Sequence, residues 1–229
     1  MRAVELFAGG RSFGKVAEEM GYEVVSTDWE AYDGIDIIQD AEWLRPSDFG
    51  PTPDIAWASF DCTTYTIAAC STHRNMDKSP KTAYAAKCDR VNQHVIAMFD
   101  HWLEENPDFL FFMENPRGNL RHMEWMKRFD RHTVWYCQYG DERAKPTDIW
   151  TNCKTWTPRP MCRNYKYDKD GEVVDRHCHH ESARRGAKTG TQGRKGSYER
   201  SLIPLDLIRE ILDCVEVQHI GVDLSVDFS

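Results

Sequence analysis

Two reactive side chains stand directly after strongly apolar runs of the sequence. Cys62 follows the run 55–60, and Glu114 follows the run 109–113. Such runs are typical of strands buried in a parallel sheet, and an open α/β sheet binds its ligands at the carboxyl ends of its strands. A thiolate can act as a nucleophile, and a carboxyl group in apolar surroundings can hold a raised pKa and act as an acid. We therefore expect Cys62 and Glu114 to face one cleft.

Both assignments have structural alternatives. A cysteine taken at random is more often a buried structural thiol than a nucleophile, and this chain has eight. Glu114 could simply end its strand before a turn at Pro116. The threonine-rich loop after Cys62 is polar, which favours the functional interpretation. Asp61 should raise the pKa of the neighbouring thiol if the two side chains approach. If its carboxylate bonds to the backbone or faces away, that effect disappears.

A second set of residues indicates a site for an adenosine-containing ligand. The apolar run 4–7 leads through two glycines into a helix predicted over 12–20, which brings backbone N–H groups to a ligand. Asp28 ends the next predicted strand, where an acid commonly binds ribose hydroxyls. Trp29 could stack on an adenine ring, and Asp36 could accept from its amino group. The alternative is that Asp28 caps a helix and Trp29 is a rim residue.

The periodicity of the chain predicts an α/β fold with a doubly wound, mostly parallel sheet. The link between the last two predicted strands is too short for a crossover helix, so we expect an antiparallel hairpin at one edge. Strands are expected at 4–7, 23–28, 34–38, 54–59, 109–113, 133–139 and 148–151, and helices at 12–20, 91–102, 120–129 and 203–215. Residues 1–152 and 201–229 would form the main domain.

Residues 153–200 would form a small insert, rich in cysteine, histidine and arginine and poor in periodicity. Three thiolates and one imidazole complete a tetrahedral zinc site, and we expect Cys153, Cys162, Cys178 and His180 to supply them. The spacing is not that of paired CxxC motifs. Unligated thiols beside a DNA-facing histidine cluster are therefore the alternative.

The composition excludes some classes of protein. The 229 residues carry a formal net charge of -8 and are 41% hydrophobic, without a run of about 18 apolar residues. We expect a globular protein with no membrane span and no signal peptide, hence a cytoplasmic one with thiols or metal ligands rather than disulfides. The insert contains a local basic patch. This patch could bind a specific anion, or it could belong to a loop that is simply exposed to solvent.

Several motifs together resemble the cytosine-5 DNA methyltransferases, most closely the small members encoded by phages. The family's first motif, DLFAGxGGxSxGF, is similar to residues 5–14, and its Pro-Cys and Glu-Asn-Val motifs are similar to Asp61-Cys62 and Glu114-Asn115-Pro116. A YGxPQxRxR segment resembles residues 139–145, and the closing motif resembles residues 201–204. The motifs occur in the family's order and cover most of the chain.

The resemblance implies a Rossmann-like class I methyltransferase that binds S-adenosylmethionine and flips a cytosine out of double-stranded DNA. Cys62 would attack C6 of the base, Glu114 would hold or protonate N3, and Arg143 would contact the base. The residues implied to bind the cofactor are Phe7, Ala8, Gly9, Gly10, Asp28, Trp29, Asp36, Phe60 and Ser201. Those implied to face DNA are Thr66, Lys145, Arg184, Arg185 and Lys188.

Two departures from the family keep other functions open. Asp61 replaces the family's proline, and only about residues 153–193 are available for target recognition. Cytosine methylation of RNA by the same chemistry is one alternative. A noncatalytic DNA-binding protein derived from this fold is another. The expected location is the cytoplasm of a bacterial or phage-infected cell, and the oligomeric state stays open, with a homodimer suited to a palindromic target.

Overall fold

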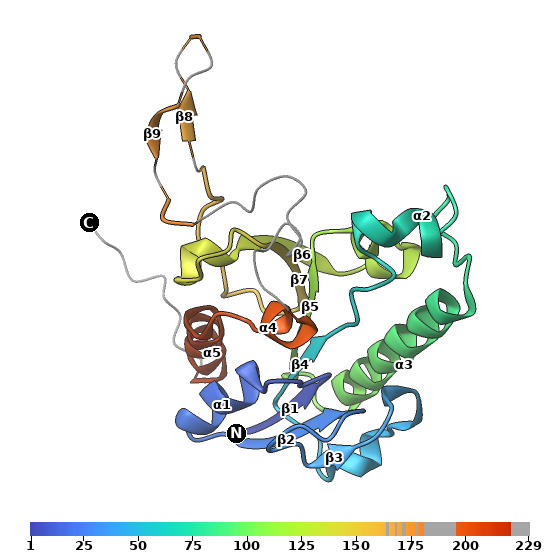
Figure 1. The fold of residues 1–229 in the computed structure, drawn as a ribbon. Helices are drawn as coiled ribbons and strands as arrows, with labels where there is room; N and C mark the ends of the chain where they lie inside the picture. The colour runs from blue at the N-terminus through green and yellow to red at the C-terminus, as the bar shows by residue number, and fades with distance from the viewer. Residues whose placement is uncertain (164, 168, 171–172, 177, 181–195, 221–229) are drawn as a thin grey trace.

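The computed structural model describes residues 1–163, 165–167, 169–170, 173–176, 178–180 and 196–220. A seven-stranded sheet forms its centre, in the order β3-β2-β1-β4-β5-β7-β6 (Figure 1). Neighbouring strands from β3 to β5 are parallel, whereas β7 runs antiparallel to both β5 and β6. The strands are β1 (Arg2–Leu6), β2 (Glu23–Asp28), β3 (Ile37–Ile38), β4 (Ile55–Ser59), β5 (Leu110–Pro116), β6 (Asp130–Trp135) and β7 (Pro146–Thr151). The predicted mixed sheet with an antiparallel edge hairpin is confirmed.

Helices cover both faces of this sheet. On one face, α3 (Ala83–Glu105) packs Val95, Phe99 and Trp102 against alternate residues of β1, β4 and β5. On the other, α1 (Ser12–Glu19) and α5 (Leu205–Ile220) pack against the intervening residues, among them Trp57 and Phe112. The central strands are buried on both sides, which explains why they read as continuous apolar runs.

The first turn of α1 depends on a buried carboxylate in β1. Glu5 accepts hydrogen bonds from the backbone N–H groups of Phe13 and Gly14, both at 3.0 Å, and from the hydroxyl of Ser26 at 3.1 Å. A helix leaves its first N–H groups without intrahelical partners, and a carboxylate there is favoured by the helix dipole. Burial nevertheless raises the pKa of Glu5 to about 7, despite these hydrogen bonds and the nearby Arg11.

Several predicted bounds differ from the structure: the helix expected over 91–102 is Ala83–Glu105, the strand expected over 34–38 is Ile37–Ile38, and β5 extends to Pro116, so Glu114 lies within it. Two other predicted elements take a different form. The helix expected over 120–129 is a pair of 3-10 turns, Asn119–His122 and Glu124–Met126, because a single turn suffices to bury Leu120 and Met126. The strand expected over 133–139 ends at Trp135, and Tyr136–Tyr139 form a 3-10 turn that ends at Gly140, whose φ is 84°.

The insert carries a small hairpin of β8 (Tyr165–Tyr167) and β9 (Val173–Arg176), which projects away from the central sheet (Figure 1). The short helices α2 (Cys70–His73) and α4 (Ser197–Ser201) lie in the connections. Within the described residues, none of the helices combines the length and apolar content needed to cross a membrane.

The raised pKa of Glu5 predicts a specific pH dependence of stability. A carboxyl group whose pKa is higher in the folded state binds more protons there, so the free energy of unfolding should fall as pH rises from about 4.5 to about 7. Glu5→Gln removes the titration, and the difference in stability between wild type and variant should therefore change across this window by up to a few kcal/mol. Urea unfolding at pH 5 and pH 8 measures it, and a pH-independent difference would contradict the assignment.

Candidate active site

The loop after β4 and the end of β5 are held together by backbone and side-chain hydrogen bonds. Ser59 pairs with Glu114 across the two parallel strands. The Asn115 side chain donates to the carbonyl of Phe60 at 2.8 Å, and the N–H of Phe60 donates to the carbonyl of Glu114 at 3.2 Å. Cys62 lies three residues beyond β4, at the same edge of the sheet as Glu114. The structure thus brings the two predicted reactive groups to one edge.

A buried ion pair anchors the loop that carries Cys62. Arg74 binds Asp89 of α3 at 2.7 Å and donates to the hydroxyl and the carbonyl of Thr64 at 2.9 and 3.2 Å. Its guanidinium also lies over the ring of Tyr65, 4.3 Å from the centroid. Tyr65 donates to Asp89 at 2.6 Å and accepts from Asn92 at 3.1 Å. Residues 64–74 are therefore fixed to α3 by mutually satisfied polar groups.

The thiol of Cys62 is partly exposed, yet its pKa is raised to about 11. Desolvation is the largest cause, followed by the negative charges of Glu114 and Asp61, while the nearby ammonium of Lys145 acts in the opposite direction. The carboxylate of Asp61 accepts from the N–H of Thr63 at 2.7 Å and from the hydroxyl of Tyr84. Asp61 therefore bonds to its own loop and to α3, and still adds charge near the sulfur.

Glu114 is 4% exposed and lies near both a hydrogen-bond donor, Tyr136, and a cation, Lys145. The hydroxyl of Tyr136 donates to it at 2.9 Å. Burial raises the pKa of Glu114, and the Lys145 ammonium is the largest effect that opposes the rise. Burial in turn lowers the pKa of Lys145, which lies 4.7 Å from the centroid of the Tyr136 ring. The arrangement favours the protonated form of this carboxyl group more than water would.

Arg143 lies near the candidate site, with its guanidinium carbon 5.8 Å from the centroid of the Tyr136 ring. It is 4% exposed, pairs with Asp141 at 2.5 Å, and donates to the carbonyls of Arg200 and Leu202 at 3.2 and 3.0 Å. These contacts connect the segment after β6 to the segment around α4, and the expected contact of Arg143 with a base stays a prediction. Lys145 is also buried, at 8% exposure, and donates to the carbonyl of Arg200 at 2.9 Å. It lies near Glu114, and its expected contact with DNA stays a prediction.

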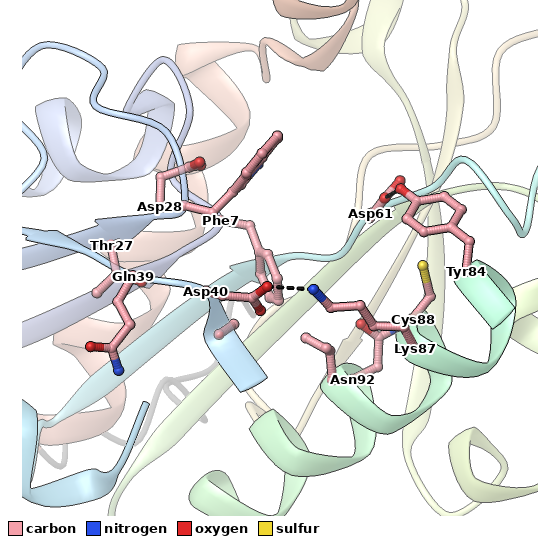
Figure 2. A pocket seen from close by; sticks show the side chains of 13 residues that line it. Phe7, Thr27, Asp28, Gln39, Asp40, Asp61, Tyr84, Lys87, Cys88 and Asn92 are labelled. Carbon is pink, nitrogen blue, oxygen red and sulfur yellow. Dashed lines mark hydrogen bonds and ion pairs between the residues drawn. The ribbon is translucent and has the colours of Figure 1, made fainter. Parts of the chain in front are cut away.

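A pocket of about 230 Å³ opens beside the Cys62 loop (Figure 2). Phe7, Thr27 and Asp28 line one side, from the carboxyl ends of β1 and β2. Asp61 lies across from them with Tyr84 of α3, and an ion pair between Asp40 and Lys87, at 2.5 Å, crosses the floor between the two sides. Since Asp61 directly precedes Cys62, the pocket reaches the edge of the sheet that carries the nucleophile candidate.

The predicted cofactor residues divide into two groups. Phe7, Asp28 and the exposed Trp29 line the pocket. Asp28 also accepts from the N–H groups of Gly9 and Glu30, at 2.9 and 3.0 Å, so it orders the loop after β1. Asp36 accepts instead from the N–H of Ser26 at 2.8 Å. The other predicted residues, which do not line this pocket, are Ala8, Gly9, Gly10, Asp36, Phe60 and Ser201.

Two of these residues belong to the contact between the loop after β1 and the segment around α4. A Cβ atom on Gly10 would lie 2.7 Å from a methyl group of Leu202, so a larger residue here would require the Leu202 side chain to shift. The hydroxyl of Ser201 donates to the carbonyl of Tyr198 at 2.7 Å. Thr66, predicted to face DNA, is half-buried and its hydroxyl donates to the carbonyl of Thr63 at 3.4 Å.

The sequence interpretation missed six polar residues of the pocket: Thr27, Gln39, Asp40, Tyr84, Lys87 and Asn92. Asp40 follows the third strand, where ligands of α/β sheets are expected, and this signal could have identified it. Tyr84 and Lys87 lie in the first turns of α3. The local sequence pattern does not indicate that they line a pocket with residues about 50 positions earlier in the chain.

A second cluster combines three thiols and an imidazole. The ligand atoms of Cys137, Cys162, Cys178 and His180 all lie within 4.8 Å of one another, and this group can hold a metal ion. Tetrahedral zinc would place sulfur atoms about 3.8 Å and a sulfur and a nitrogen about 3.6 Å apart. The Nδ1 atom of His180 lies 3.6 Å from the sulfur of Cys162 and 3.1 Å from that of Cys178. The donor set fits zinc, and the contact with Cys162 has the tetrahedral distance, whereas the contact with Cys178 is shorter.

The structure corrects one member of the predicted metal group. Cys153 is buried against α5, where its thiol contacts the hydroxyl of Thr155 and the side chain of Gln218, and it does not join the cluster. Cys137 takes its place, because the turn after β6 points this thiol toward the insert. Arg184, Arg185 and Lys188, predicted to face DNA, lie outside the described residues.

Comparisons with known proteins add no relatives: the chain matches no family model and no curated protein. The residues of the site and their geometry are therefore the basis for a function.

The electrostatics of Cys62 can be tested without any substrate. Asp61→Asn keeps an oxygen that can accept from Thr63 but removes the charge, so the pKa of Cys62 should fall and its alkylation by iodoacetamide at pH 8 should accelerate, roughly threefold for half a pKa unit. Glu114→Gln should give a larger effect, since Glu114 is the larger electrostatic cause. Peptide-level mass spectrometry provides the rates.

Cys214, on α5, is the internal control in the same samples, because Asp61 and Glu114 are not among the causes of its shifted pKa. Unchanged Cys62 alkylation in both variants would contradict the electrostatic account.

Proposed function

We propose that this protein transfers a methyl group from S-adenosylmethionine to C5 of cytosine in double-stranded DNA. The observation that carries the proposal is the placement of Cys62 and Glu114 at one sheet edge, beside a pocket lined by Asp28 and Trp29. The order of motifs that resembles cytosine-5 DNA methyltransferases supports it, as does a sheet with helices on both faces. In this proposal the fold is a doubly wound, Rossmann-like class I methyltransferase domain.

In the proposed complex, the cofactor occupies the pocket beside the Cys62 loop. S-adenosylmethionine supplies an electrophilic methyl group on a sulfonium centre. The carboxylate of Asp28 accepts two backbone hydrogen bonds, which leaves lone pairs for ribose hydroxyls. Trp29 is 68% exposed and offers a face for the adenine ring. Asp40 and Gln39, in place of Asp36, are the acceptors in the pocket for the adenine amino group.

The base would be flipped out of the duplex so that Cys62 and Glu114 can reach it. The thiolate of Cys62 would form a bond to C6 while Glu114 donates a proton to N3. The electron pair gained at C5 would then bond to the methyl carbon, and the sulfonium sulfur would keep the pair of the broken C–S bond and leave as the thioether S-adenosylhomocysteine. A base then removes the C5 proton, the C5–C6 double bond re-forms, and Cys62 leaves as a thiolate while N3 returns its proton. Covalent addition splits one difficult substitution into easier steps.

Protonation of Glu114 and ionisation of Cys62 support each other in this scheme. The negative charge of Glu114 is the second-largest cause of the raised pKa of Cys62. A base whose N3 accepts a proton from Glu114 needs that carboxyl group in its neutral form, and a neutral Glu114 no longer opposes a thiolate. Lys145 lies near both groups and favours the ionised thiol.

A noncatalytic DNA-binding protein is the second candidate, because a thiol with a pKa of about 11 is almost entirely protonated at neutral pH. Incubation with methyl-labelled S-adenosylmethionine, duplex DNA of varied sequence or RNA, followed by nucleoside mass spectrometry, separates the candidates. We expect 5-methylcytosine from duplex DNA. Its appearance only in RNA would support the RNA alternative, and no product from a protein with bound cofactor would support the noncatalytic one.

Variants of the two reactive residues should separate catalysis from cofactor binding. Cys62→Ala should abolish 5-methylcytosine, and Glu114→Gln should slow its formation by roughly 10²–10⁴-fold, as expected for loss of a positioned acid. Both variants should bind S-adenosylmethionine with nearly wild-type affinity, because neither residue lines the pocket. Calorimetry measures that affinity. Loss of cofactor binding in both would indicate a structural role instead.

We also infer that the metal ion of the Cys3His group is zinc. Three thiolates and one imidazole are the donor set that zinc prefers in structural sites. Full-length protein purified without chelators should contain one equivalent of zinc, which Cys162→Ser and Cys178→Ser should lose and Cys153→Ser should keep. Elemental analysis by mass spectrometry measures it, and loss of zinc from Cys153→Ser alone would restore Cys153 as a ligand.

A further inference from the structure

The Cys3His group connects two parts of the chain that are far apart in sequence. Cys137 belongs to the 3-10 turn Tyr136–Tyr139, whereas Cys162, Cys178 and His180 belong to the insert. Other bonds attach the insert to the same turn. Arg159 donates to the carbonyl of Gln138 at 2.7 Å, and its N–H donates to the hydroxyl of Tyr139 at 2.9 Å. The turn is therefore the place where the insert joins the main sheet.

The same turn carries a contact to the candidate active site. Tyr136 directly precedes Cys137, is fully buried, and donates through its hydroxyl to Glu114 at 2.9 Å. Its backbone N–H donates to the carbonyl of Ala144 at 2.9 Å, and this bond connects the turn to the residue that precedes Lys145. A single 3-10 turn thus holds a metal-ligating thiol and the hydroxyl that binds Glu114 in consecutive residues.

Tyr136 and Tyr139 of the turn pack in the core beside α5, whereas the described part of the insert contributes to that core only through Cys153 and Trp156 at its start. Among the described residues between 157 and 202, none belongs to either core cluster, and the last core residue before Ile203 is Trp156. A segment without a core of its own needs another source of order. Thiols are weak hydrogen-bond donors, so the four side chains alone provide much less restraint than a metal ion that crosslinks positions 137 and 180.

We propose that the metal ion in the Cys137, Cys162, Cys178 and His180 group fixes the Tyr136–Tyr139 turn and thereby positions Glu114 through Tyr136. Tyr136 is a positioning residue, and the metal acts on the catalytic edge through it while it orders the insert. The catalytic consequence rests on the proposed function, whereas the mechanical link between the metal group and the turn does not.

Hydrogen–deuterium exchange of the full-length protein tests the mechanical link. Cys162→Ser should lose its zinc, and amide exchange in residues 136–139 should accelerate by at least about tenfold. Exchange in β1 and β4 should stay unchanged, because those strands pair with neither β6 nor β7 and contribute no residue to the metal group. Cys214→Ser is the matched control, since Cys214 lies on α5 outside the group and the variant should keep both zinc and slow exchange.

His180→Cys should preserve the metal group and its effect on the Tyr136–Tyr139 turn, because four thiolates also bind zinc tetrahedrally. This variant should contain one equivalent of zinc and exchange like the wild type at residues 136–139. Tyr136→Phe should also keep zinc and slow exchange, but it should methylate DNA more slowly with an unchanged affinity for S-adenosylmethionine. Such a split would not arise if the turn merely maintained the fold.

Wild-type protein without zinc, or a zinc-free Cys162→Ser variant whose residues 136–139 exchange like the wild type, would overturn the proposal. Faster exchange spread over the whole sheet would also overturn it, because the metal would then support the fold in general. If the exchange results are as expected but no 5-methylcytosine forms in the wild type, the mechanical link stands and the proposed function fails.

Discussion

The parallel pairing of β4 with β5 is the constraint on which the site depends. Because the strands run in the same direction and Ser59 pairs with Glu114, the chain leaves β4 at the level where the carboxyl group lies. The side chain of Asn115 then holds the carbonyl of Phe60, so the departing loop cannot swing away from this edge. A change of register by one residue would turn Glu114 to the other face of the sheet.

Much of this arrangement could be predicted from local pattern, because strands buried on both faces are visible as apolar runs. The runs at 55–60 and 109–113 are β4 and β5, and the two groups that follow them meet at one edge as expected. The Cys62 loop owes its shape to Arg74 and Asp89, which are 15 residues apart. A buried ion pair of that kind is set by tertiary packing and leaves no periodic trace in the sequence.

The metal group illustrates the same limit. Cys162, Cys178 and His180 are close in sequence and could be identified from composition. Cys137 could not, because an apolar, aromatic segment such as 133–139 is typical of a strand, in which successive side chains alternate between faces. The chain instead turns after Trp135, and the 3-10 geometry places Tyr136 toward Glu114 and Cys137 toward the insert. Cys153 is closer than Cys137 in sequence to the other three ligands, but its side chain packs against α5 instead.

Asp61 is the residue at which the electrostatic and the geometric demands of the site conflict. A proline before the nucleophile would restrict the backbone without adding charge. Asp61 restricts the same loop by different means: its carboxylate accepts from the N–H of Thr63, two residues ahead, and from the hydroxyl of Tyr84 on α3. These bonds fix the turn that presents Cys62, and they also draw part of the negative charge toward donors. The remaining charge still raises the pKa of the thiol, and the buried ammonium of Lys145 opposes it. Lys145, which directly precedes β7, therefore offsets part of the charge that Asp61 places near the sulfur, and the pKa of the thiol stays raised.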